Sequence, residues 1–224
     1  MTSGGARGPY EKGRMKRQQI VEAALEAYAD SGATGPSLRT IAQVAGTTER
    51  ALLHYFASRD DLFTQVLRER DRALKSGISE EPSVEELGAA VAREAEVPGL
   101  SRLFLEIAAR AAGEPGPANE FFGERYRELV PLVAGVLNNP KGGGAAESFD
   151  PEWAARILVA AADGLQIQWL LDPTIDMQAD LAALAHHLAA PDQDRSAFDV
   201  GTFTDRLISR DTTGSRDPGP SHTE

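Results

Sequence analysis

One short stretch of the sequence, from Thr47 to Arg59, is rich in hydroxyl, guanidinium and imidazole side chains that can hydrogen-bond to bases and phosphates. Its apolar side chains recur at the spacing of one buried helix face: Ala51, Leu52, Tyr55 and Phe56. The polar side chains must then occupy the opposite, outward face. A helix of this kind fits the major groove of DNA, with an outward set of Thr47, Thr48, Glu49, Arg50, Leu53 and His54.

Two short helices separated by a glycine turn would hold this outward face in place. The first has apolar side chains at i, i+3, i+4 and i+7 from Leu38, and Ser37 is a natural cap for its start. Gly46 favours the left-handed conformation that ends a helix sharply, and Thr47 or Thr48 can cap the second helix. An earlier amphipathic helix closes the core of this predicted helix-turn-helix unit with Ile20, Ala23, Ala24, Ala27 and Tyr28.

The order of these motifs resembles the N-terminal DNA-binding domain of the tetracycline-repressor (TetR) family, without a gap from Arg17 to Leu67. Two positions depart from the usual family pattern. Leu53 stands where most members have a tyrosine that contacts a phosphate, and Arg59 replaces a usual lysine. The agreement rests on Ile20, Ala23, Ala24, Tyr28 and Gly32, on the run from Ser37 to Gly46, and on Tyr55, Phe56, Ser58, Arg59 and Leu62.

The resemblance implies a DNA-binding regulator and a set of contact residues. Arg39 occupies a position from which the family contacts a base or a phosphate. Arg59 keeps the positive charge of a phosphate contact, whereas Leu53 could touch a thymine methyl group or pack inward. The DNA-binding residues expected here are Arg17, Ser37, Arg39, Thr47, Thr48, Glu49, Arg50, Leu53, His54, Tyr55 and Arg59.

The net charge of −11 hides an asymmetry along the chain. Residues 1–75 hold 12 Lys and Arg against 9 Asp and Glu, a net charge of +3, so the other 149 residues carry −14. We expect a flexible basic arm over residues 1–14, which could follow phosphates or enter a minor groove. A merely solvated tail is an equally weighted alternative.

The composition is typical of a soluble protein, because no apolar run approaches the ~20 residues needed to span a bilayer. The basic start lacks the hydrophobic segment of a signal peptide, and the chain has no cysteine. We therefore expect a cytoplasmic protein without a membrane partner.

Helical periodicity continues beyond Phe63, and no alternating β pattern appears. We expect an all-α fold, in which a DNA-binding domain (15–62) precedes a larger helical domain (63–190) for effector binding and dimerisation. A loop should follow Asn138, and the tail (191–224) should be mostly disordered. The expected helices of the larger domain begin after the caps Ser58 and Ser83 and span about 100–112, 119–138 with a kink at Pro131, 151–171 and 180–189.

The predicted helix 151–171 has an apolar face too wide for one neighbour, and the predicted helix 180–189 adds apolar residues at helical spacing. Two such helices from each of two chains would make a four-helix interface, and a palindromic operator needs a two-fold protein. We therefore expect a homodimer, although the helices could instead bury each other within one chain. The expected interface residues are Ile157, Ala161, Ala162, Leu165, Trp169, Leu181, Leu184 and Leu188.

An enzyme has little support in the sequence. The four histidines, His54, His186, His187 and His222, lack the spacing of a metal-binding helix, and neither a phosphate loop nor a nucleophile motif is present. We expect no catalytic residue, cofactor or metal site.

A small-molecule sensor that releases DNA is the favoured function, with the resemblance supplying the idea of a repressor. Its alternative is a ligand-independent DNA-binding regulator or nucleoid-type protein, which the lack of a ligand-sized cavity would favour. Aromatic and polar side chains of the larger domain are candidates for ligand contact, although each is more often a core residue. They are Phe104, Phe121, Phe122, Tyr126, Trp153, Gln166 and Trp169.

Overall fold

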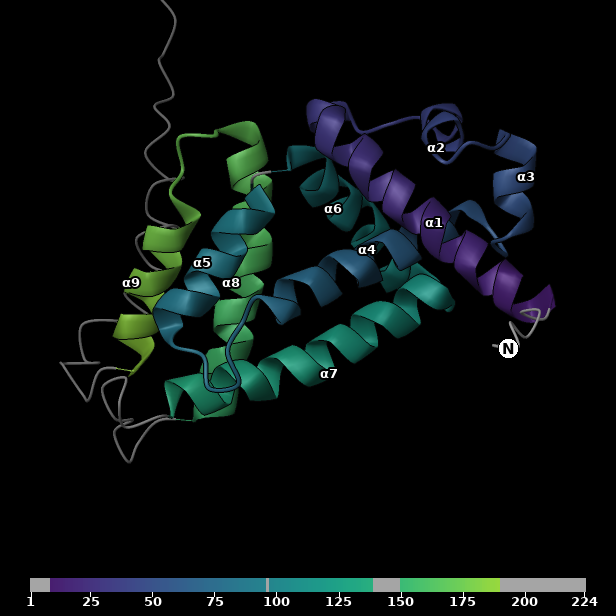
Figure 1. Ribbon diagram of the computed structural model, residues 1–224. Helices are drawn as coiled ribbons and strands as arrows, with labels where there is room; N and C mark the ends of the chain where they lie inside the picture. Colours follow the sequence, from purple (N-terminus) through teal and green to yellow (C-terminus); the bar gives the residue numbers. More distant parts are fainter. Residues whose placement is uncertain (1–8, 96, 139–149, 190–224) are drawn as a thin grey trace, which may run out of the picture.

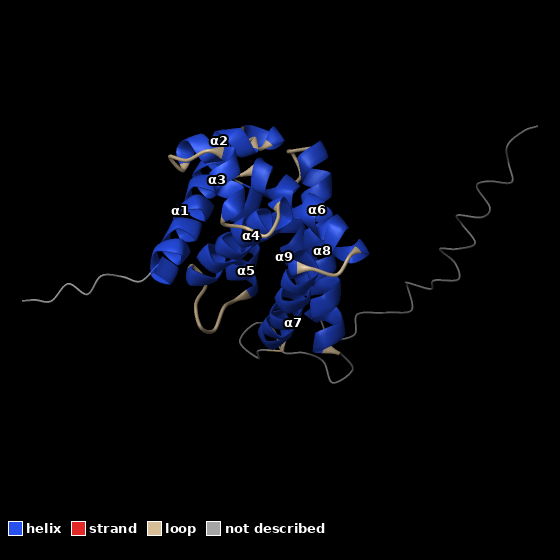
Figure 2. Ribbon diagram, turned by 90° about the vertical axis from the view of Figure 1, so that its right-hand side faces the viewer, coloured by secondary structure: helices blue, strands red, loops and turns tan. Residues whose placement is uncertain are grey.

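The computed structural model describes residues 9–95, 97–138 and 150–189, and within these ranges the fold is helical and contains no strand (Figure 2). The expectation of an all-α fold is confirmed. At one end lie α1 (Pro9–Asp30), a 3₁₀ turn (Gly32–Thr34), α2 (Leu38–Val44) and α3 (Glu49–His54), as Figure 1 shows. In the middle lie α4 (Arg59–Ser76), α6 (Pro98–Gly113) and α7 (Pro117–Leu137), and at the far end α5 (Val84–Ala95), α8 (Pro151–Leu171) and α9 (Met177–Ala189).

The caps predicted from the sequence are present at the helix starts. The Ser37 hydroxyl accepts a hydrogen bond from Thr40 N at 3.1 Å, and the Ser58 hydroxyl accepts one from Asp61 N at 3.0 Å. Of the two candidate threonines, Thr48 caps α3, with its hydroxyl accepting from Ala51 N at 3.1 Å. Gly46 has a φ of 60°, the left-handed conformation that a residue with a side chain rarely adopts.

Four helices begin earlier than the sequence indicated: α1, α9 and, by two residues each, α6 and α7. α1 begins at Pro9, so residues 9–14, which we expected in the flexible arm, are helical. Proline suits the first position of a helix because it has no amide hydrogen to leave unpaired. α9 begins at Met177 rather than 180, where Asp176 accepts a hydrogen bond from Ala179 N at 3.0 Å. The predicted loop and tail lie largely outside the described residues.

The hydrophobic core runs without a break from the first three helices into the rest of the molecule. Ile20, Ile41 and Leu52 belong to the same buried cluster as Phe63 of α4 and Phe104 of α6. A second cluster lies at the far end, between α7, α8 and α9. We call α1–α3 the reading head and α4–α9 the body, and the shared core implies that the head cannot move independently of α4 and α6.

Candidate DNA-binding surface and body cavity

The surface of α3 is divided as its sequence pattern predicts. Leu52 and Phe56 are buried in the core of the head, whereas Glu49, Arg50 and His54 are exposed. Leu53 is 37% exposed and lines a shallow hollow with Arg50 and His54. Its outward placement keeps it available for an apolar contact with a thymine methyl group.

The remaining candidates on and around α2 differ in how much of each side chain is available. Arg39 is exposed on α2. The Ser37 hydroxyl is engaged by Thr40 N and lies 2.8 Å from the Thr40 hydroxyl. Thr47 is half-buried, and its backbone N–H donates to Ala42 O at 2.9 Å. These contacts stabilise the turn, so Arg39 is the side chain of this group best placed to reach DNA.

Two cations of the head, Lys16 and Arg17, and Arg59 at the start of α4 are held by contacts within the chain. Arg17 pairs with Asp61 at 3.4 Å and lies over the Phe56 ring, 4.8 Å from its centroid. Arg59 is exposed and lies 5.0 Å from the centroid of the Phe63 ring. Lys16, which the sequence analysis missed, donates from Nζ to Ala45 O at 3.0 Å at the end of α2. A basic residue near the last carbonyls of a helix interacts favourably with its dipole.

Tyr55 and Tyr28 pack the head from the inside. Tyr55 is half-buried, with its ring edge toward His54 at a centroid distance of 5.9 Å. Tyr28 lies under the 3₁₀ turn, and burial, followed by the charge of Glu106, raises its pKa to about 12. Both rings therefore support the reading surface more than they extend it.

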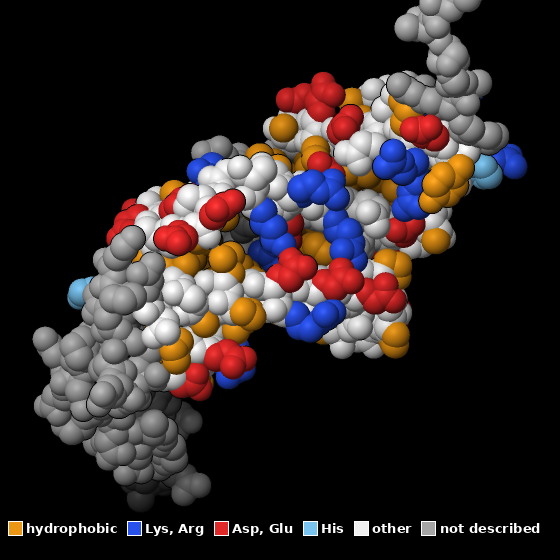
Figure 3. Space-filling model, turned by 60° about the horizontal axis from the view of Figure 1, so that its bottom comes forward, with side chains coloured by type: hydrophobic (Ala, Val, Ile, Leu, Met, Phe, Trp, Pro, Cys, Tyr) orange, Lys and Arg blue, Asp and Glu red, His pale blue; other side chains and the backbone are white. Residues whose placement is uncertain are grey.

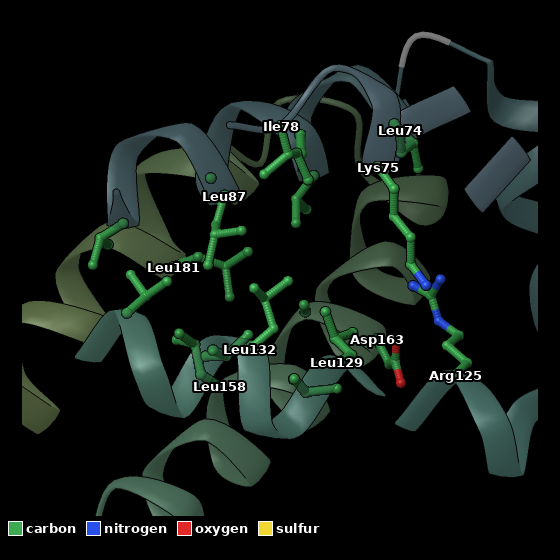
Figure 4. Close-up of a pocket in the computed structure, with 18 of the residues that line it drawn as sticks. Leu74, Lys75, Ile78, Leu87, Arg125, Leu129, Leu132, Leu158, Asp163 and Leu181 are labelled. Atoms are coloured by element: carbon green, nitrogen blue, oxygen red, sulfur yellow. The ribbon is translucent and has the colours of Figure 1, made fainter. Parts of the chain in front are cut away.

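The body contains a cavity of about 310 Å³ between α4, α5, α7, α8 and α9, and this cavity is partly open to solvent (Figure 4). Leu87, Leu158 and Leu181 lie toward one end, and Lys75, Arg125 and Asp163 lie toward the other. The volume is at the lower end of the range of small-molecule pockets. We did not identify the charged side chains at the second end from the sequence.

The polar end of the cavity is internally paired. Asp71 and Arg125 form a largely buried ion pair, and Lys75 pairs with Glu128 closer to solvent. The Tyr126 hydroxyl donates to Asp163 at 2.7 Å. Burial and this hydrogen bond raise the pKa of Tyr126, so the phenol stays protonated and remains the donor.

Elsewhere on α4 and α7, acidic and basic side chains are interspersed across the middle of the face in Figure 3, and Arg68 pairs with Glu124 at 2.7 Å.

The residues expected to contact a ligand are mostly located elsewhere. Gln166 lines the cavity, and Tyr126 reaches it through Asp163. Trp153 is 43% exposed on the outside of α8, and Trp169 is half-buried and does not line the cavity. The other three candidates instead form the core between head and body, where they pack edge to face: Phe104, Phe121 and Phe122.

The residues expected at a dimer interface also separate into groups. Ala162 and Leu181 line the cavity, so they face the interior of one chain. Ile157 is exposed on α8. Half-buried positions account for the others: Ala161, Leu165, Trp169, Leu184 and Leu188. The sequence analysis missed two exposed apolar side chains on the outer side of α8, Ile167 and Leu171.

Two features are absent from the described residues. None of their helices is long and apolar enough to cross a membrane. Within the same residues, we find no group of three or more His, Cys, Asp or Glu side chains arranged to hold a metal ion.

Comparisons with known proteins agree with this division into head and body. A model described as bacterial regulatory proteins of the tetR family matches residues 20–66, and one described as the C-terminal domain of BetI-type transcriptional repressors matches residues 84–191. The HTH-type transcriptional repressor AcnR of Corynebacterium diphtheriae is 30% identical over 71 residues, covering 32% of this chain and 37% of AcnR. The chain thus spans little more than a third of the length of that relative.

Longer matches extend into the body. The HTH-type transcriptional regulator TtgR of Pseudomonas putida is 26% identical over 185 residues, covering 76% of this chain and 88% of TtgR. A TetR transcription regulator from Haloarcula marismortui has the same fold, with a TM-score of 0.63 and 19% identity over 79% of this chain and 100% of that one. The two family models together match most of the chain, and members of the family are regulators rather than enzymes. This chain belongs to the TetR family and is a DNA-binding transcriptional regulator of that type.

Proposed function

We propose that the protein is a homodimeric repressor, which binds a palindromic operator through α2 and α3 of each chain and releases it when a small molecule occupies the body cavity. One observation supports this proposal best. Helix α4 contributes Phe63 and Leu67 to the core beneath the reading head and Leu74 and Lys75 to the lining of the cavity. A ligand that displaces one end of α4 therefore also shifts the part of α4 against which the reading head packs.

The outer side of α8 supports the homodimer. Trp153, Ile157, Ile167 and Leu171 are 43%, 39%, 49% and 83% exposed. At 100° per residue, these four side chains fall on one stripe of the helix, which we call the outer stripe. A continuous apolar stripe on a surface helix is typical of an interface, and a two-fold partner with the same stripe would bury it.

The alternative, a ligand-independent regulator or nucleoid-type protein, is less well supported. It would not need the cavity of about 310 Å³ that separates α5 and α9 from α4 and α7. We place the repressor in the cytoplasm, because a regulator must reach DNA there.

Operator titration of an Arg39→Ala variant tests the proposal. We would first select bound fragments from genomic DNA with the full chain, then compare affinities for the selected operator. Arg39 is exposed and caps nothing, so its removal should weaken binding by about 1–3 kcal/mol while the variant melts as the parent does. Arg102→Ala is the control, because Arg102 is exposed on α6 and pairs only locally with Glu106 at 3.0 Å. Parental affinity in a folded Arg39→Ala variant would contradict the assigned surface.

A further inference from the structure

We propose that the ligand of the body cavity is an uncharged aliphatic molecule with one hydrogen-bonding head group, such as a medium-chain alcohol, amide or lactone. This inference rests on the proposed function, because it names the chemical class of the effector. It follows from the walls of the cavity, from its paired charges and from one buried amide.

The walls favour an aliphatic chain over a ring. Leucine, isoleucine, valine and alanine side chains from α4, α5, α7, α8 and α9 make up most of the lining (Figure 4). None of the described residues that line the cavity is aromatic. Flat aromatic ligands bind by stacking on aromatic side chains, and quaternary ammonium groups bind in aromatic cages. Both classes would lack their usual partners here.

The charges at the polar end favour a neutral head group. Arg125 is paired with Asp71, with exposed side-chain fractions of 13% and 9%, and Lys75 is paired with Glu128. Asp163 already accepts the hydrogen bond of the Tyr126 hydroxyl. A carboxylate or ammonium group entering this end would compete with the largely buried pair of Asp71 and Arg125, and separating that pair would leave a buried charge uncompensated.

Gln166 offers the neutral contact. Its side chain is 1% exposed and lines the cavity one helical turn beyond Asp163, on the same side of α8. Its Oε1 atom is buried and has no hydrogen-bond partner among the described residues. Buried polar atoms are nearly always paired, so this oxygen requires a partner, which is either an ordered water or a polar group of a ligand. A hydroxyl or amide N–H of the ligand would satisfy it.

The size of the cavity limits the length of the ligand's aliphatic tail. About 310 Å³ is near the lower limit for small-molecule sites, which suits a medium-chain molecule rather than a large planar drug. With its head at Gln166, the tail of such a molecule would run toward Leu87, Leu158 and Leu181 (Figure 4).

Calorimetric titration of the full chain with four probes tests the inference. Decan-1-ol has the predicted tail and head, decanoate and decyltrimethylammonium keep the tail but carry a charge, and 2-naphthol keeps a hydroxyl on an aromatic ring. We expect decan-1-ol to bind at least about tenfold more tightly than each of the other three. The Gln166→Leu variant should bind decan-1-ol about three- to tenfold more weakly than the parent. Gln19→Leu, at an exposed site on α1, is the matched control and should not change the affinity.

Each outcome decides between classes of ligand. Tighter binding of either charged probe would overturn the neutral head, and tighter binding of 2-naphthol would overturn the aliphatic chain. If none of the four binds, the inference fails, while operator binding by the parent still supports the DNA-binding part of the proposed function. If decan-1-ol binds as predicted but leaves operator affinity unchanged, the ligand class stands and effector-controlled release fails. Should Gln166→Leu not fold, the probe series on the parent decides alone.

Discussion

The reading head and the body are both helical, but they present their functional side chains in opposite ways. In the head, α2 and α3 turn polar side chains outward from a filled core, and Leu52 beneath them is fully buried. In the body, helices from both halves of the chain turn aliphatic side chains inward and leave a cavity between them. A surface that must bind a rigid duplex is supported from behind, whereas a site for a small molecule requires incomplete packing.

The two regions therefore depend on different interactions. The head depends on local hydrogen bonds, such as the caps provided by Ser37 and Thr48. The body depends on contacts between distant segments, such as the pair between Asp71 and Arg125. Substitutions that alter one region and leave the other unchanged can test whether the two regions depend on different interactions.

The largest effect is expected from the outer stripe. Ile157→Glu should shift the protein toward monomer, because each of two symmetric sites would bury an unpaired carboxylate. Operator affinity should fall by about 10²–10⁴-fold, because two linked heads bind the operator more tightly than one head alone by a factor of that order. Sedimentation and operator titration measure the two effects side by side.

Ala109→Glu, on an exposed position of α6, is the control for added charge. Ala162, although expected at the interface, is unsuitable because it lines the cavity. A dimeric Ile157→Glu variant would remove the outer stripe from the interface.

A smaller effect is expected where head and body meet. A Cβ at Gly99 would lie 2.7 Å from Gly32 O and 3.2 Å from Tyr28 Cδ1, so Gly99→Ala should lower stability by roughly 1–3 kcal/mol. Gly123→Ala is the matched control on α7, where nothing lies within 4 Å, and it should stabilise the protein by about 0.5–1 kcal/mol. Urea unfolding of both variants gives the comparison. Equal free energies of unfolding for the two variants would mean that the head is not in close contact with α6 at Gly99.

Alkaline pH should act on the head through Tyr28. Its pKa rises from 10.0 to about 12 on folding, so the unfolded chain loses this proton first. The contribution of the protonated Tyr28 to the free energy of unfolding is present below pH 10 and is lost as the pH rises toward 12. At pH 11 this loss of stability is about 1.4 kcal/mol. Tyr28→Phe should therefore lose less stability than the parent between pH 9 and pH 11. Parallel pH profiles of the two proteins would show that Tyr28 titrates normally.

The smallest effect is expected at Leu53. Because its side chain is 37% exposed beside Arg50 and His54, Leu53→Tyr should leave the melting temperature unchanged and leave or raise operator affinity. Melting and titration of the same preparation check this. A large loss of stability would place Leu53 in the core instead.

The sequence predicts the head better than the body, and the reason is physical. The caps at Ser37, Thr48 and Ser58 act over three residues, so their spacing alone identifies them. In the body, the start of α8 is likewise a local signal, because Asp150 caps the helix and Pro151 occupies its first position.

The cavity lining could not be predicted, because helical periodicity shows which side chains face inward but not whether a neighbour fills the space. Leu129 and Leu158 are therefore indistinguishable by pattern from core residues, although they line the cavity. The opposite error affected Phe104 and Phe122, which we expected near a ligand and which pack against each other at a centroid distance of 5.1 Å. Large aromatic side chains bury the most apolar area, so the contact between head and body uses them.

The central claim is that two reading heads, joined through the bodies, act on one operator. The most direct test is the affinity and stoichiometry of the parent protein on a selected palindromic duplex and on a duplex carrying one half-site of equal length. We expect two chains on the palindrome, bound at least about 100-fold more tightly than on the half-site duplex. Equal affinities for the two duplexes, or a single chain on the palindrome, would contradict it.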